Sequence, residues 1–253
     1  MKIDRPKSPL PTGRFASNRR TKKFLFRVKT SLFSQTSGTF ASCCGFYLLA
    51  ALLGGCVPVM SLHPLFTDES ITFEERLLGT WVDDPNSPET TWEFTRLADS
   101  PEHEWEFNRP KKPEKAYKLV LINNQDGTKG SFFARLVKLK DRLFLDIYPS
   151  QLPCKKPDPN DGWLFNALFL IPGHSFIIID SIEPRLKMRL TDDDDMEKLL
   201  KEDPNAVKHE IVDDRLILTA STKELQAFVL KYADDTRVFN NDIALSRKKA
   251  KAQ

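Results

Sequence analysis

Residues 117–148, YKLVLINNQDGTKGSFFARLVKLKDRLFLDIY, decide the fold class of this chain. Tyr117, Leu119 and Leu121 point to one face of a predicted strand, and Lys118 points to the other. The turn residues at 123–127 lead to a second predicted strand at 131–139, and a short turn at 140–142 leads to a third at 143–148. Consecutive strands joined by short turns predict an antiparallel meander.

Strand patterns continue on both sides of this meander. Further strands are predicted at 79–82, 91–95, 163–170, 175–182, 186–190, 207–212, 215–219 and 243–246, with Pro172-Gly173-His174 as a turn. The segment 149–159 holds four prolines in eleven residues and cannot pair as a central strand. Because strands resume directly after it, we interpret it as a loop inserted in one domain.

Helical patterns are short and fall mostly near the C-terminus. Residues 73–78 predict one or two helical turns, and Met196, Leu199 and Leu200 form the apolar face of a short helix. Ser221 and Glu224 form a capping box before a second helix with a stripe of Leu225, Phe228, Val229 and Tyr232. The sequence therefore predicts a mostly β (α+β) fold, an antiparallel meander or a barrel, with two short helices in its C-terminal part.

The tripeptide Gly79-Thr80-Trp81 follows the first helical turns, and a late helix precedes one final strand. This order resembles the lipocalins, where a Gly-x-Trp motif opens the first barrel strand and its Trp packs across the closed end. The resemblance implies a lipocalin-like barrel with a cavity for a small apolar ligand. The chain departs from the family in its extra helix, its proline-rich loop and the lack of a recognisable arginine motif at the barrel base. Trp81 is equally compatible with an ordinary β-sheet core.

The charge of the chain is divided between two parts. The 253 residues carry 38 basic and 35 acidic side chains, but residues 1–55 hold ten basic side chains and one acidic side chain, Asp4. The remainder is therefore acidic, with a net charge of −6. An acidic body argues against binding to nucleic acid through phosphate neutralisation. Since no stretch after Asp68 approaches about 20 uncharged apolar residues, a transmembrane helical bundle is also excluded.

An apolar run at 46–53 follows the basic segment and ends in Leu53-Gly54-Gly55-Cys56. Basic segment, apolar run and small residues are the order of a secretory signal. The last four residues resemble the lipobox of bacterial lipoproteins, which implies cleavage between Gly55 and Cys56 and acylation of Cys56. The alternative is an uncleaved signal anchor over 40–62, which has enough uncharged residues to span a bilayer.

Three segments follow from this interpretation: a signal peptide at 1–55, a lipidated Cys56 with a tether at 56–68, and a single β-rich domain at 69–253. Because 55 residues is long for a signal peptide, we expect translation to begin downstream of Met1, at Leu25 or Val28. In the lipoprotein resemblance, Val57 in place of aspartate implies delivery to the outer membrane, with the domain on the periplasmic face.

Few residues form a recognisable catalytic or metal-binding pattern. The segment His103-Glu104-Trp105-Glu106 offers two ligands on one strand face, which is too few for a metal. His174 can be a general base or can satisfy turn backbone, and we favour the turn role. Asp192–Asp195 precede a helix and suit its N-terminus better than calcium. Cys154 lies between prolines and lysines, and we expect no role for it. His63 and His209 are isolated.

These observations favour a membrane-anchored envelope lipoprotein with a non-enzymatic binding or scaffolding β domain. Its expected partners are membrane lipid, held through acylated Cys56, and an apolar small ligand or another envelope protein. We expect no cofactor, metal or catalytic residue. Two alternatives stay open: a lipocalin-like carrier of a small apolar ligand, and an envelope hydrolase with carboxylates such as Asp146, Asp180 or Glu183 on separate strands.

Overall fold

The computed structural model describes residues 58–102, 108–151, 170–191, 193–213 and 215–248. Several predicted features lie outside these ranges: the signal peptide, Gly55, Cys56, His103, Cys154 and nearly all of the strand at 163–170. Within them, no helix has the length and apolar character needed to cross a membrane.

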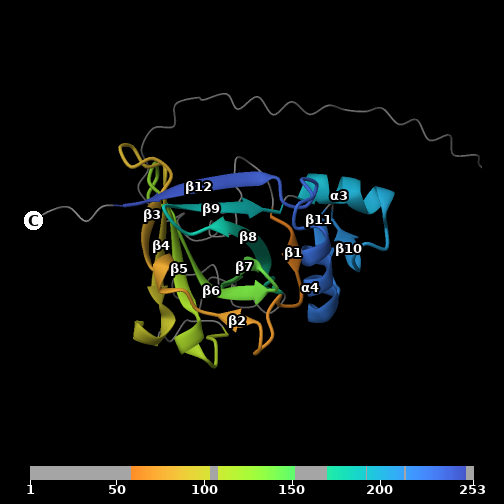
Figure 1. Cartoon of the computed structure of the whole chain (residues 1–253), viewed down its shortest axis with the longest axis horizontal. Coiled ribbons are helices and arrows are strands. Elements are labelled where there is room, and N and C mark those ends of the chain that lie inside the picture. The colour runs from red at the N-terminus through yellow and green to blue at the C-terminus, as the bar shows by residue number, and fades with distance from the viewer. Residues whose placement is uncertain (1–57, 103–107, 152–169, 192, 214, 249–253) are drawn as a thin grey trace, which may run out of the picture. The chain divides into compact units, whose positions relative to one another are not determined.

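Eight antiparallel strands form a closed barrel in the described part of the chain (Figure 1). Each strand pairs with the next in sequence, and the last strand, β12, pairs with both β9 and β3. The predicted antiparallel meander is therefore confirmed, and it closes into a barrel. The strands are β3 (Gly79–Val82), β4 (Thr90–Arg96), β5 (Tyr117–Asn123), β6 (Lys129–Leu139), β7 (Arg142–Pro149), β8 (Ser175–Ser181), β9 (Arg185–Leu190) and β12 (Asn241–Arg247).

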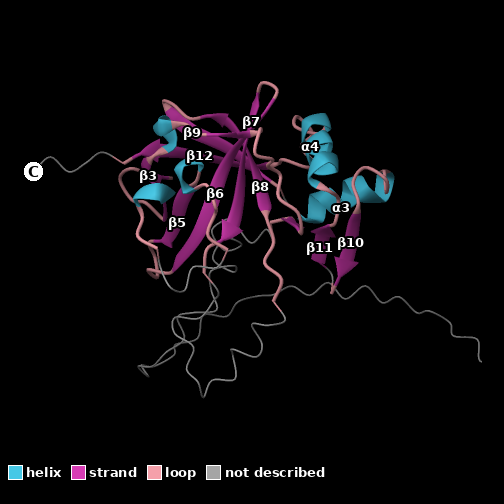
Figure 2. Cartoon of the chain, turned by 90° about the horizontal axis from the view of Figure 1, so that it is seen from below, coloured by secondary structure: helices cyan, strands magenta, loops and turns pink. Residues whose placement is uncertain are grey.

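A smaller three-stranded sheet and two helices lie beside the barrel (Figure 2). The capping box predicted before the second helix is present, with Ser221 N donating to Glu224 Oε2 at 2.8 Å. The elements are β1 (Met60–Ser61), β10 (His209–Val212), β11 (Arg215–Leu218), α3 (Asp193–Glu202) and α4 (Thr222–Lys231). The remaining pieces are β2 (Ile71–Thr72), which pairs with β6, and the 3-10 turns η1 (Glu75–Leu77), η2 (Leu97–Asp99) and η3 (Pro113–Lys115).

Side chains of the chain itself occupy the barrel interior. Trp81, Trp92, Phe94 and Tyr117 are fully buried there. Aliphatic side chains complete this core: Leu119, Leu121, Leu136, Leu145, Ile147, Ile177, Leu186, Met188, Leu190 and Leu245. An eight-stranded barrel is just wide enough either to be filled by side chains or to hold one small ligand. Here the space that the lipocalin resemblance assigns to a ligand is taken by aromatic and aliphatic groups.

A second apolar cluster lies on the outer face of β6, β7 and β8. Val137, Phe144 and Ile178 point outward from these strands and pack against the two helices. The helices contribute Met196, Leu199, Leu200, Leu225, Phe228 and Val229. Because both faces of these strands are covered, β6 and β7 have long apolar runs in place of the strict alternation of a half-exposed strand.

Arg247 closes the end of the barrel that carries Trp81. Its guanidinium carbon lies 4.3 Å from the centroid of the Trp81 ring, and its nitrogens donate to Leu78 O at 2.7 Å and Arg76 O at 2.6 Å. The sequence shows no recognisable arginine motif for the barrel base, but the structure places Arg247 there. Arg247 was overlooked because it stands at the start of a basic segment that resembles an ordinary charged tail.

Residues 58–67 do not form the free tether that we predicted. Val59 and Leu65 are buried, and β1 pairs in parallel with β11. Thr222 Oγ1 and Gln226 Nε2 of α4 donate to Pro64 O and Leu65 O, each at 2.8 Å. The prolines of this segment suggested a linker, but its apolar side chains belong to the outer cluster, so the folded domain begins before residue 69.

Candidate functional site

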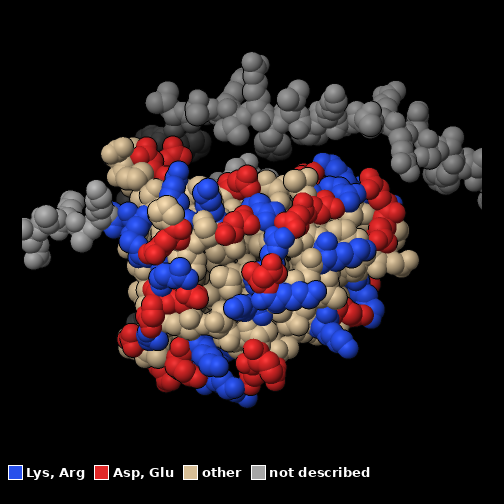
Figure 3. All heavy atoms as spheres, viewed as in Figure 1, with Lys and Arg blue, Asp and Glu red and all other residues tan. Residues whose placement is uncertain are grey.

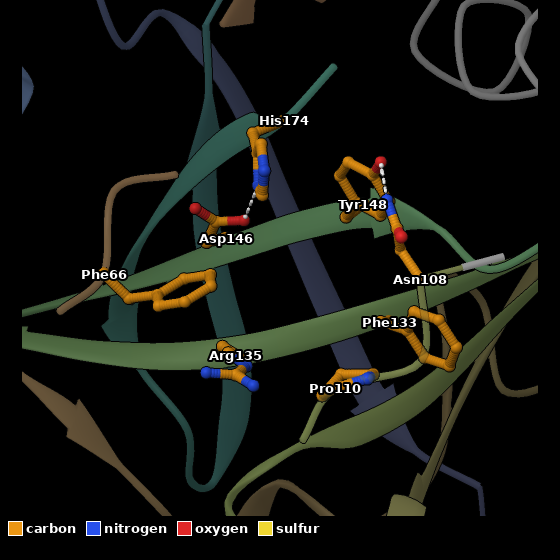
Figure 4. Close-up of a pocket in the computed structure, with 8 residues that line it drawn as sticks. All are labelled: Phe66, Asn108, Pro110, Phe133, Arg135, Asp146, Tyr148 and His174. Atoms are coloured by element: carbon orange, nitrogen blue, oxygen red, sulfur yellow. Dashed lines mark hydrogen bonds and ion pairs between the residues drawn. The ribbon is translucent and has the colours of Figure 1, made fainter. Parts of the chain in front are cut away.

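A pocket of about 190 Å³ lies on the outer face of the barrel, over β6 and β7 (Figure 4). Its floor comes from two pairs of directly opposed residues, Phe133 with Tyr148 and Arg135 with Asp146. Side chains alternate between the faces of a strand, so these four groups point away from the packed interior. The walls come from distant segments: Phe66, Asn108, Pro110 and His174.

Asp146 is held from two sides. Its side chain is nearly inaccessible to solvent, and Oδ2 accepts a hydrogen bond from Leu65 N at 2.6 Å. Oδ1 lies 2.6 Å from Nδ1 of His174. With its proton on Nδ1, His174 donates to the carboxylate, and Asp146 fixes the orientation of the imidazole.

His174 is held by its backbone as well as by Asp146. Its N–H donates to Ser61 O at 2.8 Å, and Ser61 N donates to His174 O at the same distance. Its ring centroid lies 4.6 Å from that of Tyr148 and 6.1 Å from that of Phe66. The turn role predicted for His174 is therefore wrong, because the residue extends β8 by a bridge to the N-terminal segment and its side chain lines the pocket.

Arg135 places a positive charge in the pocket. The residue is only 9% exposed, and its guanidinium carbon lies 4.3 Å from the centroid of the Phe66 ring. Burial lowers the pKa of this guanidinium, although arginine still keeps its charge in proteins. Among the residues that the structure describes, none forms a hydrogen bond or an ion pair with it. Arg135 therefore has a stacking partner but no bonded anion.

The carboxylates that act on Arg135 electrostatically form no hydrogen bond with it among the described residues. Asp146 bonds Leu65 and His174, and Asp68 accepts a hydrogen bond from Lys112 Nζ at 2.7 Å. That lysine lowers the pKa of Asp68. Asp146, Asp68 and Glu114 favour the charged form of Arg135 electrostatically, in that order. Their negative charges partly offset the energetic cost of burying the guanidinium, but they accept no hydrogen bonds from its N–H groups.

The rim of the pocket carries hydrogen-bonding groups and apolar surface. Asn108 Nδ2 donates to the Tyr148 hydroxyl at 3.1 Å, and Asn108 adopts the left-handed backbone conformation with φ of 50°. Phe133 is buried in the floor, whereas Phe66 and Tyr148 are partly exposed. The pocket thus combines one guanidinium, one carboxylate and one imidazole with three aromatic rings.

The other sequence candidates do not join this site. Asp180 pairs with Arg189 at 2.8 Å, and Glu183 lies 3.4 Å from Arg247 at the barrel end. His209 Nδ1 lies 2.9 Å from Val207 O, and His63 is exposed. Asp193–Asp195, predicted to precede a helix, form the first turn of α3 itself, and Asp192 lies outside the described residues. Among the described residues, no group of three or more His, Cys, Asp or Glu side chains could hold a metal ion.

Sequence reasoning missed Arg135. A signal was present, because Arg135 and Asp146 are charged residues inside otherwise apolar strand segments, FFARLV and LFLDIY. Such residues either face solvent or line a site, and only the structure shows that the surrounding face is covered.

The surface charge gives no stronger candidate on the face shown in Figure 3, where basic and acidic side chains are mixed over the described residues. Comparisons with protein-family models, curated proteins and solved structures find no match for this chain. The chemistry of the pocket is therefore the best guide to function.

Proposed function

We propose that this chain is an envelope lipoprotein, anchored through acylated Cys56, whose barrel is a binding module for a small molecule. The ligand site is the pocket on the outer face of β6 and β7. The observation that carries this proposal is Arg135, a charged side chain that is 9% exposed, lines a cavity and has no bonded anion among the described residues. A binding module needs a few fixed polar groups among apolar walls, which is the composition found here.

The outer pocket suits ligand binding better than the barrel interior. Two tryptophans, Trp81 and Trp92, are buried inside the barrel, and a ligand placed there would have to displace side chains of the packed core. The outer pocket needs no such rearrangement. The lipocalin-like carrier of an apolar ligand is therefore the less favoured form of the binding proposal.

Hydrolysis is a second candidate, favoured by the 2.6 Å contact between His174 and Asp146. An imidazole oriented by a buried carboxylate can accept a proton from water or from a substrate hydroxyl. Arg135 could stabilise an anionic intermediate in the same pocket. Among the three carboxylates considered from sequence, only Asp146 lies at this site.

Two experiments test the proposal. Labelled palmitate should enter the wild-type protein in bacteria and should be absent from the Cys56→Ser variant; incorporation that survives the substitution contradicts the anchor. For the binding module, we expect small molecules to co-purify with the full chain and to be extractable from it. The Phe133→Trp variant should carry a smaller amount of them, because its larger side chain fills the pocket. A Leu121→Met substitution in the barrel core is the matched control. Hydrolysis of simple esters that is lost in His174→Gln would favour the second candidate.

A further inference from the structure

We propose that the outer pocket binds one anionic group, a carboxylate or a phosphate, through the Arg135 guanidinium. This inference rests on the proposed binding function and names the chemistry of its ligand. The groups that carry it are Arg135, the aromatic rings around it and the engaged state of the nearest carboxylates.

Arg135 has no bonded anion among the residues that the structure describes. Removing a guanidinium from water is costly unless hydrogen bonds and an opposite charge compensate it. Arg135 is 9% exposed and stacks on Phe66, which orients its plane but accepts none of its N–H groups in ordinary hydrogen bonds. A bound carboxylate or phosphate would accept two parallel bonds from the guanidinium.

Asp146 does not supply this anion. Asp146 stands opposite Arg135 across the β6–β7 pair, but its oxygens bond Leu65 N and His174 Nδ1. Asp68 forms an ion pair with Lys112 instead. Asp146, Asp68 and Glu114 act on Arg135 electrostatically, and their negative charges disfavour a highly charged anionic ligand. Lys112 and Lys115 partly offset the charge of Asp68. This balance favours a ligand with a single negative charge at the guanidinium.

The aromatic rings near Arg135 suit an apolar body of the ligand. Phe66, Phe133 and Tyr148 offer aromatic surface around the cation, so a flat or short apolar group can pack there while its anionic end meets Arg135. The cavity of about 190 Å³ is smaller than the 300–1,000 Å³ of sites for drug-sized ligands. The ligand is therefore a small acid or the head of a larger molecule.

One wall of the pocket is built by residues close in sequence to Cys56, and this leaves two sources for the anion. Ser61 bridges His174, and Phe66 covers Arg135, so residues just after Cys56 build one wall. Ser61 is five positions after Cys56, a separation that spans at most about 18 Å of extended chain. An acylated Cys56 would keep the pocket near a bilayer. The anion is then either a free small acid or the headgroup of a membrane amphiphile, and both share the chemistry that Arg135 recognises.

The test compares benzoate with its neutral isostere benzamide on the full chain in a neutral detergent. We expect calorimetry to detect benzoate at millimolar concentration or below and to detect benzamide at least about tenfold more weakly, since a hydrogen bond to a charged group is worth that factor. Arg135→Met should abolish the preference for benzoate, and Arg135→Lys should keep part of it because lysine retains the charge without the fork. The control is Arg142→Met, which removes an arginine paired with Asp234 outside the pocket.

A second readout protects the test from a variant that fails to fold. If Arg135 is kept for a ligand, replacing it with methionine should leave the ligand-free protein at least as stable as the wild type, because a buried unpaired charge is removed. A much less stable Arg135→Met protein would mean that Arg135 is a structural residue, and the inference would be overturned.

The two sources are separated with vesicles. Benzoate is titrated into the full chain held on phosphatidylcholine vesicles with or without phosphatidylglycerol. If benzoate binding is lost on the anionic vesicles, the lipid headgroup occupies the site, which supports the inference and identifies the ligand as a headgroup. If benzoate binding is unchanged, the inference is supported with a free acid as the ligand. Equal affinity for benzoate and benzamide, or no binding of benzoate, overturns the inference. If extracted small molecules bind equally well to the wild type and to Arg135→Met, the proposed binding function is supported. The inference that the ligand is an anion held by Arg135 is then overturned.

Discussion

Arg135 and Asp146 face each other across the β6–β7 pair, yet Asp146 bonds His174 and the backbone of Leu65 instead of the arginine. Opposite charges on neighbouring strands usually pair when nothing else competes for them. Here the carboxylate fixes the N-terminal segment and the imidazole, and the guanidinium remains available at the pocket floor. This arrangement underlies the proposal that the outer face of the barrel binds an anion.

Asp146 should be important for stability. Asp146→Ala leaves Leu65 N–H buried without its acceptor and removes the partner of His174, so we expect a loss of about 2–4 kcal/mol in the free energy of unfolding. Chemical denaturation measures it. In Asp180→Ala, which breaks a partly exposed pair with Arg189, the loss should be about 1 kcal/mol or less. Similar losses in the two variants would contradict the role assigned to Asp146.

Arg247 should stabilise the barrel end through Trp81. Arg247→Met removes a cation over the indole ring and two hydrogen bonds to Leu78 O and Arg76 O. We expect a loss of about 1–3 kcal/mol, measured by urea unfolding followed through tryptophan fluorescence. Arg76→Met, which leaves the Arg76 carbonyl in place and removes only an exposed pair with Glu74, should change stability much less. An Arg247→Met protein as stable as Arg76→Met would argue against this contact.

The N-terminus of α4 should give the protein an acid-sensitive contribution to stability. Hydrogen bonds from Lys208 and then Ser221 lower the pKa of Glu224 from 4.5 to about 2. A carboxyl group whose pKa is lowered by folding stabilises the fold above its unfolded pKa, and this contribution is lost as the pH falls through the folded pKa.

Glu224→Gln should therefore lower the melting temperature at neutral pH. The difference from wild type should shrink between pH 4.5 and about pH 2, where wild-type Glu224 becomes protonated. Thermal melts across this range measure it, and Lys223→Gln in the same turn is the control. A difference that stays constant down to pH 2 would exclude a contribution from the Glu224 charge.

Residues 58–67 should be required for folding. A chain that begins at Glu69 lacks β1, the buried Leu65 side chain and the Leu65 N–H that bonds Asp146. We expect it to melt at a much lower temperature, or without cooperativity, than a chain that begins at Pro58. Circular dichroism melts compare the two. Equal melting temperatures would restore the original view of this segment as a tether.

Local patterns predicted the regular elements well. The alternation around Tyr117, the turn at 123–127 and the capping box at Ser221 each depend on neighbouring residues, and each is present in the structure. The order of strands left a meander and a barrel as alternatives, and the structure closes the barrel by placing β12 between β9 and β3.

Contacts between distant segments were not predictable in the same way. The pocket joins Phe66, Arg135 and His174, which lie far apart in the sequence, and nothing near Arg135 reveals that Phe66 covers it. The buried state of Leu65 depends on the outer cluster, which forms only after the helices pack on β6 and β7. The prolines of residues 58–67 suggested a linker, because a local sequence pattern carries no information about packing against distant segments.

The most direct test of the account is a crystal structure of the protein with 4-bromobenzoate, in which the anomalous signal of bromine locates the ligand. If Arg135 binds the anion, bromine should lie among Phe66, Phe133 and Tyr148, with the carboxylate bonded to Arg135. Bromine inside the barrel beside Trp92, or a ligand in the pocket with its carboxylate turned away from Arg135, would contradict it.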